Sequence, residues 1–244
     1  MSNTRSFQDS AFVLHSVPYK ETSLIVELFC RDYGRLPVIA KGAKRPHSHL
    51  RSVLVSFQPL QVRFSGKSEV KTLTQAEWMG QMLAPQGKAL FASYYLNELL
   101  MRGLSREDAH TALFDLYALT LQALGDGTDM NVCIRRFEVG LLDALGYGID
   151  WFLDKDGRGI VADTAYRWQD QAGWCTPDGG YVNHTSVAHV EPLVPGQFVL
   201  QVQQGQWTLA AANALKPLVR RLLLTHVAPN GLMSRAWMEQ LVRS

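Results

Sequence analysis

The first 80 residues alternate between short apolar runs and turn signals, which is typical of a small β domain. Five runs have the length and composition of strands: residues 11–17, 24–30, 36–40, 60–65 and 69–75. Turn signals such as Asp32-Tyr33-Gly34 and Gly66 separate them. Five short strands with no long helix between them predict a closed antiparallel barrel, and such a barrel is the usual form of an OB-fold.

After residue 85 the apolar residues recur with the period of an α-helix. Helices are therefore expected over residues 92–103, 113–124 and 134–145, and again over 211–223 and 234–242. The short links between the first three predict a compact bundle. Ser105 and Asp108 resemble a capping box for the second helix, and Pro217 should kink its helix or start a new one.

Residues 150–207 interrupt the helical pattern, because they are rich in glycine, aspartate and aromatic residues. This composition is typical of turns and short β-ribbons. The sequence therefore predicts an α+β protein with an N-terminal five-stranded antiparallel OB-fold barrel in residues 1–80. A helical domain should follow in residues 81–244, with a small β-ribbon insert at about residues 150–207.

The composition excludes several classes of protein. The chain has 244 residues, of which 47% are hydrophobic and 19% charged, so general disorder is excluded. Its three cysteines, Cys30, Cys133 and Cys175, are too few and too scattered for a disulfide framework. No apolar run is long enough to span a membrane, and the N-terminus has no apolar signal core. We expect a cytoplasmic protein.

The charge is unevenly distributed along the chain, although the net charge is only +2. Residues 1–80 contain 11 Lys and Arg against 6 Asp and Glu, whereas residues 81–209 contain 8 against 15. Residues 210–244 are basic again. Basic ends around an acidic middle indicate separate binding surfaces, and clustered positive charge favours a polyanionic partner such as nucleic acid.

The densest basic cluster follows the third predicted strand. Lys41, Lys44, Arg45 and Arg51 lie within eleven residues, in a loop that Gly42 and Pro46 keep irregular. Such a loop can lie along a phosphate backbone and gain affinity by releasing counterions. Four further cations could complete one basic face of the barrel: Arg35, Arg63, Lys67 and Lys71. The alternative is a mobile, solvated loop.

Single-strand binding also uses exposed aromatic rings on which bases stack. Tyr19, Tyr33 and Phe57 are candidates, but each could equally pack against the barrel. With few clear platforms, electrostatics should dominate any affinity for DNA.

The third predicted helix carries Arg135 and Arg136 beside an apolar stripe that includes Phe137 and Leu141. Glu138 falls on this stripe and needs a partner, which Arg135 can supply. The alternative is that a half-buried cation beside a hydrophobic groove binds an acidic peptide with an apolar tip. A second basic patch could bind phosphate or such a peptide, or be a solvated face: Lys216, Arg220 and Arg221, with Arg235 beyond.

Recognisable catalytic and metal motifs are missing from the sequence. Residues 154–159 superficially resemble a calcium loop, but they lack the later acidic ligands, so a turn is favoured. Cys175, His184 and His189 are spaced too loosely for a structural zinc site. An enzyme using Asp154, Asp156 and Asp163 is a minor alternative. We therefore expect no metal, no cofactor and no enzymatic activity.

Short motifs along the chain, weak when taken singly, become specific in their order and spacing. They are Ala11-Phe-Val-Leu-His15, Glu21-Thr-Ser-Leu24, Gly34-Arg35, Ala40-Lys-Gly-Ala-Lys-Arg45, Glu69-Val-Lys-Thr-Leu73, Tyr95-Leu-Asn-Glu-Leu-Leu100, Arg135-Arg-Phe-Glu138 and Leu145-Gly-Tyr-Gly148. With them the chain resembles the RecO recombination mediators of bacteria from about residue 11 to 150. The resemblance weakens through the insert and returns at Leu232-Met-Ser-Arg235.

The resemblance implies an OB-fold followed by a helical domain, and a protein that works on DNA at the nucleoid. It implies binding of single- and double-stranded DNA and annealing of complementary strands. It also implies cooperation with RecR, contact with the acidic C-terminal tail of the single-strand DNA-binding protein, and loading of RecA onto coated DNA. Many RecO-like proteins hold zinc with two cysteine pairs in the insert, but only Cys175 is present here. Zinc is therefore not carried over, and aromatic packing should hold the insert.

An RNA-binding OB module of the translation machinery is the main competing hypothesis. The lack of a row of aromatic base platforms disfavours it mildly.

Overall fold

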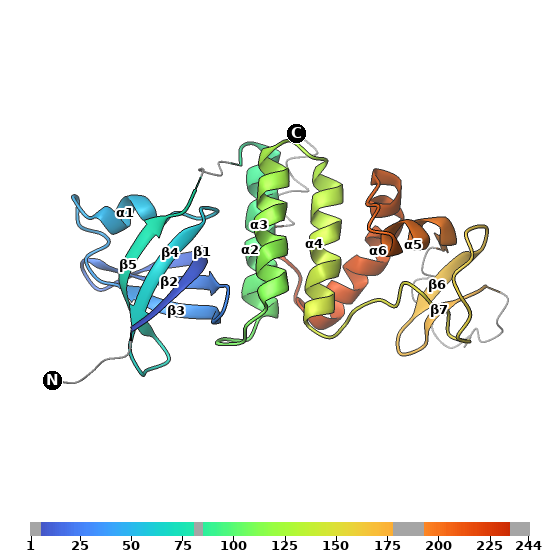
Figure 1. Ribbon diagram of the computed structural model, residues 1–244, viewed down its shortest axis with the longest axis horizontal. Coiled ribbons are helices and arrows are strands. Elements are labelled where there is room, and N and C mark those ends of the chain that lie inside the picture. Colours follow the sequence, from blue (N-terminus) through green and yellow to red (C-terminus); the bar gives the residue numbers. More distant parts are fainter. Residues whose placement is uncertain (1–5, 81–84, 178–192, 235–244) are drawn as a thin grey trace. The chain divides into compact units, whose positions relative to one another are not determined.

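The computed structural model describes residues 6–80, 85–177 and 193–234, and it divides into two compact units. The first unit contains the chain up to Thr128 together with the segment from Gly231, and the second contains Asp129–Asn230. Figure 1 traces the elements in chain order.

The first unit begins with a closed five-stranded barrel in which the strands follow the order β1-β2-β3-β5-β4. Its strands are β1 (Ser6–Tyr19), β2 (Ser23–Cys30), β3 (Gly34–Ala40), β4 (Leu60–Ser65) and β5 (Lys71–Trp78). The predicted OB-fold barrel is confirmed. Four strand pairs are antiparallel, whereas the β3–β5 pair that closes the barrel is parallel. The short helix α1 (His49–Val53) lies between β3 and β4, in a stretch for which the sequence predicted only a loop.

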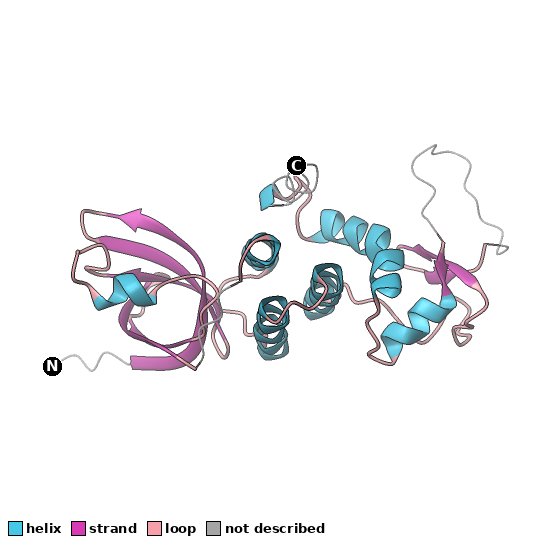
Figure 2. Ribbon diagram, turned by 90° about the horizontal axis from the view of Figure 1, so that it is seen from above, coloured by secondary structure: helices cyan, strands magenta, loops and turns pink. Residues whose placement is uncertain are grey.

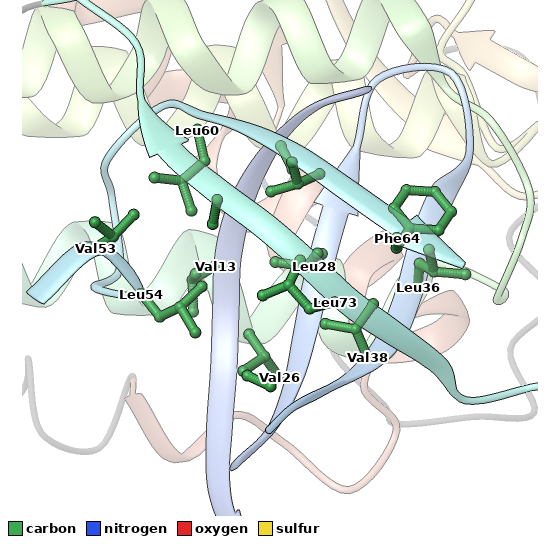
Figure 3. Close-up of a cluster of buried hydrophobic side chains, with 14 of the residues drawn as sticks. Val13, Val26, Leu28, Leu36, Val38, Val53, Leu54, Leu60, Phe64 and Leu73 are labelled. Carbon is green, nitrogen blue, oxygen red and sulfur yellow. The ribbon is translucent and has the colours of Figure 1, made fainter. Parts of the chain in front are cut away.

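The long strand β1 makes closure possible, because its first half pairs with β4 and its second half pairs with β2. A register shift between Val13 and His15 bends it around the barrel. The interior is filled by aliphatic side chains and Phe64, and Leu54 from the end of α1 contributes to the same cluster (Figure 3). Burying each Leu or Phe side chain here stabilises the fold by roughly 1.5–3 kcal/mol.

Two helices of the first unit pack beside the barrel: α2 (Lys88–Gly103) and α3 (Thr111–Gly125). Phe12 and Phe29, on the outer face of β1 and β2, contact the Phe114 and Tyr117 rings of α3 with centroids 5.0–6.0 Å apart. Burial raises the pKa of the Tyr117 hydroxyl, which therefore stays protonated and donates to Asn97 of α2.

The predicted capping box is wrong. Helix α3 begins at Thr111 after His110, and no side chain caps it. Ser105 and Asp108 lie in the preceding loop, where Asp108 Oδ2 is 3.4 Å from His110 Nε2. The Asp in place of the usual Glu or Gln was already a poor match to the motif.

The second unit is built on α4 (Met130–Ala144) packed against α6 (Leu209–His226), as Figure 2 also shows. Asp129 caps α4 by accepting hydrogen bonds from the Asn131 and Val132 backbone N–H groups. Pro217 lies inside the continuous helix α6, so it does not start a new helix.

The insert is a small sheet in the order β7-β6-β8, made of β6 (Ala165–Gln169), β7 (Gly173–Cys175) and β8 (Val194–Pro195). Trp174 is fully buried at its centre, and three rings surround it at centroid distances of 5.2–6.5 Å: Trp151, Tyr166 and Trp168. This confirms the predicted aromatic packing. Helix α5 (Gly196–Gln203) forms where only ribbons and turns were expected. The helix predicted over residues 234–242 lies almost entirely outside the described residues.

Candidate nucleic-acid interface

The basic loop, defined as Lys41–Arg51, runs from the end of β3 into α1, which carries Arg51, and its backbone anchors it to the barrel. Ala43 is completely buried in the barrel core. The Lys44 N–H donates to the Thr22 carbonyl in the β1–β2 turn at 2.9 Å, and Arg45 N–H donates to the Gly42 carbonyl at 3.1 Å. Gly42 has a φ of +73°, which favours glycine. The structure therefore supplies backbone anchors that a purely mobile loop would lack.

The four cations of the basic loop are exposed: Lys41, Lys44, Arg45 and Arg51. Within the described parts of the chain, none of them lies at ion-pair distance from a carboxylate. Two adjoining surface depressions of about 510 and 540 Å³ share the Pro46–Ser48 segment. Lys41 and Arg45 line the first, and Arg51 lines the second. Among the described residues, the loop thus presents positive charge without acidic partners beside two surface depressions.

The other predicted cations of the barrel have different surroundings. Arg63 and Lys67 are exposed, and Arg63 Nε donates to Gln8 Oε1 at 2.8 Å. Arg35 is largely buried, 3.8 Å from Glu27. Lys71 pairs with Glu107 at 2.7 Å and is only 14% exposed. The structure therefore does not unite all eight predicted DNA-binding residues in one free basic face.

Arg35 and Lys71 belong to an acid-paired seam between the barrel and the helical part of the same unit. The seam consists of the cations Arg31, Arg35, Lys71 and Arg106 with the acids Glu27, Glu69, Glu107 and Asp115. Arg106 bridges Glu27, at 2.8 Å, and Glu69.

The loop that precedes α3 also packs directly on β3. The Glu107 N–H donates to the Arg35 carbonyl at 2.9 Å. A Cβ on Gly34 would lie 1.9 Å from the Asp108 carbonyl oxygen, and the φ of Gly34 is +66°. Glycine at this position is therefore required for the seam to close.

The predicted aromatic platforms are mostly packed. Phe57 is buried against Tyr94, and Tyr33 lies edge-on against Phe7 and Phe64. Tyr19 is partly exposed, with the Lys20 ammonium 5.3 Å from its ring centroid.

Trp78, which is 47% exposed at the end of β5, was not among the predicted site residues. Strand alternation with the buried Ala76 would place Trp78 inside the barrel, but the strand ends at the rim. A tryptophan in the last position of a strand that borders a basic loop was the available signal.

On α4 the structure confirms the pairing of Arg135 with Glu138, and both side chains are buried. Arg136 is exposed. Phe137 and Leu141 have no exposed surface and belong to the core. The predicted combination of a half-buried Arg135 beside an open apolar groove is therefore not what the described residues form.

On α6, Lys216 and Arg220 are exposed, as predicted. Arg221 is partly buried and pairs with Asp170 of the insert at 2.7 Å. Arg235 lies outside the described residues.

The acidic segment of the insert is a turn, as predicted. Asp154 Oδ1 accepts hydrogen bonds from the backbone N–H groups of Asp156 and Arg158, each at 2.9 Å.

Among the residues with described positions, no group of three His, Cys, Asp or Glu side chains could hold a metal ion. Burial raises the pKa of the Cys175 thiol, and His184 and His189 lie outside the described residues. No helix in the described part of the chain is long and apolar enough to cross a membrane.

A closed five-stranded barrel with a basic, acid-free loop defines an OB-fold protein with a helical extension. Comparison with known families then gives two matches that together cover nearly the whole chain. Recombination protein O N terminal matches residues 1–82, and Recombination protein O C terminal matches residues 85–236.

Curated relatives agree with these matches. The chain is 40% identical over 237 residues to a DNA repair protein RecO from Azoarcus sp. (strain BH72), covering 96% of both chains. It is 43% identical over 235 residues to the protein of that name from Aromatoleum aromaticum, covering 96% of this chain and 95% of the relative. The chain belongs to the RecO family of DNA repair proteins.

Proposed function

We propose that this protein is a non-enzymatic mediator of recombinational DNA repair that binds single- and double-stranded DNA and anneals complementary strands. In this proposal it acts with RecR and helps to load RecA onto DNA coated by single-strand DNA-binding protein. Membership of the RecO family supports these roles. In this proposal the protein acts on DNA at the nucleoid. No cofactor is needed, because annealing and loading depend on binding energy rather than on bond chemistry.

The observation that carries DNA binding is the set of four exposed cations on the basic loop, none of which has a carboxylate of the described residues at ion-pair distance. Charges that are not neutralised within the fold can release counterions from a phosphate backbone. Such contacts position a strand without reading its sequence, as annealing of arbitrary sequences requires. Arg63 and Lys67 extend the proposed surface, whereas Arg35 and Lys71 contribute less because acids already face them.

The direct test reverses two charges of the loop. Lys44→Glu with Arg45→Glu should weaken binding to all DNA sequences by at least about tenfold and reduce the salt slope by about 2. The measurement is a salt titration with single- and double-stranded oligonucleotides. Lys88→Glu, an exposed lysine at the start of α2, is the control for a surface charge change in the same unit. An unchanged affinity and slope in the double variant would remove the loop from the interface.

The same titration with matched RNA separates DNA repair from the alternative, an RNA-binding module of the translation machinery. The DNA proposal expects RNA to bind no more tightly than DNA of the same length. A clear preference for RNA would favour the alternative.

We further propose that the second unit binds the acidic tail of the single-strand DNA-binding protein. Exposed cations on α4 and α6, which pack together, support this: Arg136, Lys216 and Arg220. Arg135, Phe137, Leu141 and Arg221 would support these cations from beneath. A ligand with several carboxylates and an apolar tip needs such cations at its rim.

Arg136→Ala should weaken an acidic tail peptide by about 1–3 kcal/mol, because a charge-assisted hydrogen bond is lost. Calorimetry with the peptide measures this, and thermal melting checks the fold. Arg135→Ala is the contrasting variant, since it removes the buried ion pair with Glu138 and should act mainly on stability. Full peptide affinity in a folded Arg136→Ala variant would exclude Arg136 from the site and leave Lys216 and Arg220 as the candidates.

A further inference from the structure

The apolar end of β5 lies against the helix that ends the basic loop. The Trp78 Nε1–H donates to the Val53 carbonyl at 3.1 Å, and the Val55 backbone N–H donates to the same carbonyl at 2.8 Å. Val53 is the last residue of α1, two positions after Arg51. The indole is therefore tied to the segment that carries one of the free cations.

Trp78 keeps a large apolar surface in water in spite of this hydrogen bond. It is 47% exposed, and its neighbours Met79 and Val55 are each 40% exposed. An indole whose N–H is already engaged offers a ligand its π-face and edge rather than a hydrogen bond. A half-exposed indole tied to the segment that follows a basic loop, whose cations have no ion pair with a described carboxylate, matches the chemistry of an unpaired nucleotide, which has one anionic and one aromatic end.

We propose that Trp78 is a stacking platform for an unpaired base of a DNA strand whose phosphates lie along the basic loop. The inference rests on the proposed function, because it needs the strand to follow Lys41–Arg51. Base and phosphate of one nucleotide are separated by a single sugar. A strand held at Arg51 can therefore direct a base toward the ring fixed at Val53. In duplex DNA the bases are stacked on one another, so Trp78 adds affinity only for single strands.

Stacking tolerates any sequence because every base has a π-face. Trp78 would thus give the barrel a preference for unpaired DNA without a preference for sequence. The cations alone would bind any polyanion of sufficient charge density. The two contributions are physically separable, and this makes the proposal testable apart from the phosphate contacts.

The test compares oligo-dT with a strand of equal length and charge that carries abasic sites, at one salt concentration. The wild-type protein should bind oligo-dT at least about fivefold more tightly. Trp78→Leu, which keeps an apolar side chain but removes the ring, should abolish this preference and leave duplex affinity unchanged. Trp78→Phe should retain part of it. Phe152→Leu, at a 62% exposed aromatic residue of the other unit, is the matched control and should keep all of it.

A preference for oligo-dT that survives in Trp78→Leu would overturn the proposal, as would equal binding of both strands by the wild-type protein. Failure of the proposed function looks different, because the Lys44→Glu and Arg45→Glu variant would then bind every strand as well as the wild type does. If Trp78→Leu does not fold, fluorescence of Trp78→Phe decides. Oligo-dT should quench the wild-type protein more than the abasic strand does, and the substitution should remove that difference while binding persists.

Discussion

The barrel carries two groups of basic side chains that differ in whether an acid faces them. In the acid-paired seam, Arg106 and Lys71 meet carboxylates at 2.7–2.8 Å. In the basic loop, Lys44 and Arg45 are exposed and have no such partner among the described residues. Cations of both groups count toward the positive charge of residues 1–80: four come from the loop, and Arg31, Arg35 and Lys71 come from the seam. Net charge therefore does not identify a binding surface, but the location of the neutralising acids does.

The difference follows from burial. Glu27 and Arg35 keep only 10% and 16% of their side-chain surface, so each needs an opposite charge to offset the hydration that it loses. The loop cations stay hydrated and need no partner. Charge in the seam thus stabilises the joint between barrel and helices, whereas charge on the loop is available to a ligand.

The largest expected effect comes from removing the acid at the centre of the seam. Glu27→Ala leaves Arg106 and Arg35 without their shared carboxylate, and it should lower the free energy of unfolding by about 3 kcal/mol. Urea denaturation measures this. Glu77→Ala, at an exposed position of β5, is the matched control and should have little effect.

DNA affinity of the folded Glu27→Ala variant should equal or exceed that of the wild type, because a negative charge has been removed from a positive protein. A variant of normal stability would show that the seam is not structural. If Glu27→Ala has normal stability but reduced DNA affinity, the seam would take part in DNA binding, and it would no longer differ from the basic loop in function.

Glu98 on α2 is another acid with partners in the fold, and it should make the folding stability depend on pH. Burial raises the pKa of Glu98, but hydrogen bonds from Ser234, Met233 and Arg102 outweigh it, so the net pKa is lowered. The stability that Glu98 contributes is therefore present above its ordinary pKa of 4.5 and is lost as pH falls through the lowered value. The basic loop contains no carboxylate, so it should contribute no carboxylate titration of this kind.

Glu98→Gln should cost about 1 kcal/mol near neutral pH and flatten the acid side of the stability profile. Hydrogen exchange at the Met233 and Ser234 amides reads this locally, because both donate to Glu98 at 2.8–3.0 Å. If protection of these two amides is the same in both proteins, the carboxylate does not hold the segment. Glu77→Gln, which removes an acid at an exposed site of β5, controls for the change of net charge.

How far the sequence could predict this molecule depends on the range of the interactions. Barrel strands and helices follow from local periodicity, and the buried pairing of Arg135 with Glu138 follows from their spacing of three residues. The seam could not be predicted, because Glu27 and Arg106 are 79 residues apart and meet only through the fold. Trp78 was missed because the fifth predicted strand ends at residue 75, whereas β5 continues to Trp78 and leaves its side chain half exposed. The sequence shows the clustering of the loop cations because they are close together in the chain, but that no described carboxylate lies at ion-pair distance from them is a property of the fold.

The smallest effect, and the finest division between the two groups, concerns Lys71. It was predicted to be part of the DNA surface, yet it pairs with Glu107 at 2.7 Å and also donates to the Ser68 carbonyl at 2.9 Å. A lysine already engaged in this way releases few counterions when DNA binds, so Lys71→Ala should reduce DNA affinity by less than about twofold. Lys44→Ala, in contrast, should remove one full phosphate contact and reduce the salt slope by about 0.9. Removing the pair should lower the free energy of unfolding by only about 0.5–1 kcal/mol, because Glu107 is half exposed.

The decisive comparison is the two alanine variants in one salt titration. Equal losses of affinity and salt slope in the two variants would mean that Lys71 breaks its ion pair with Glu107 to bind phosphate. Seam cations would then contribute to DNA binding. A loss confined to Lys44→Ala would keep the two groups distinct, with one holding the fold together and the other binding the ligand.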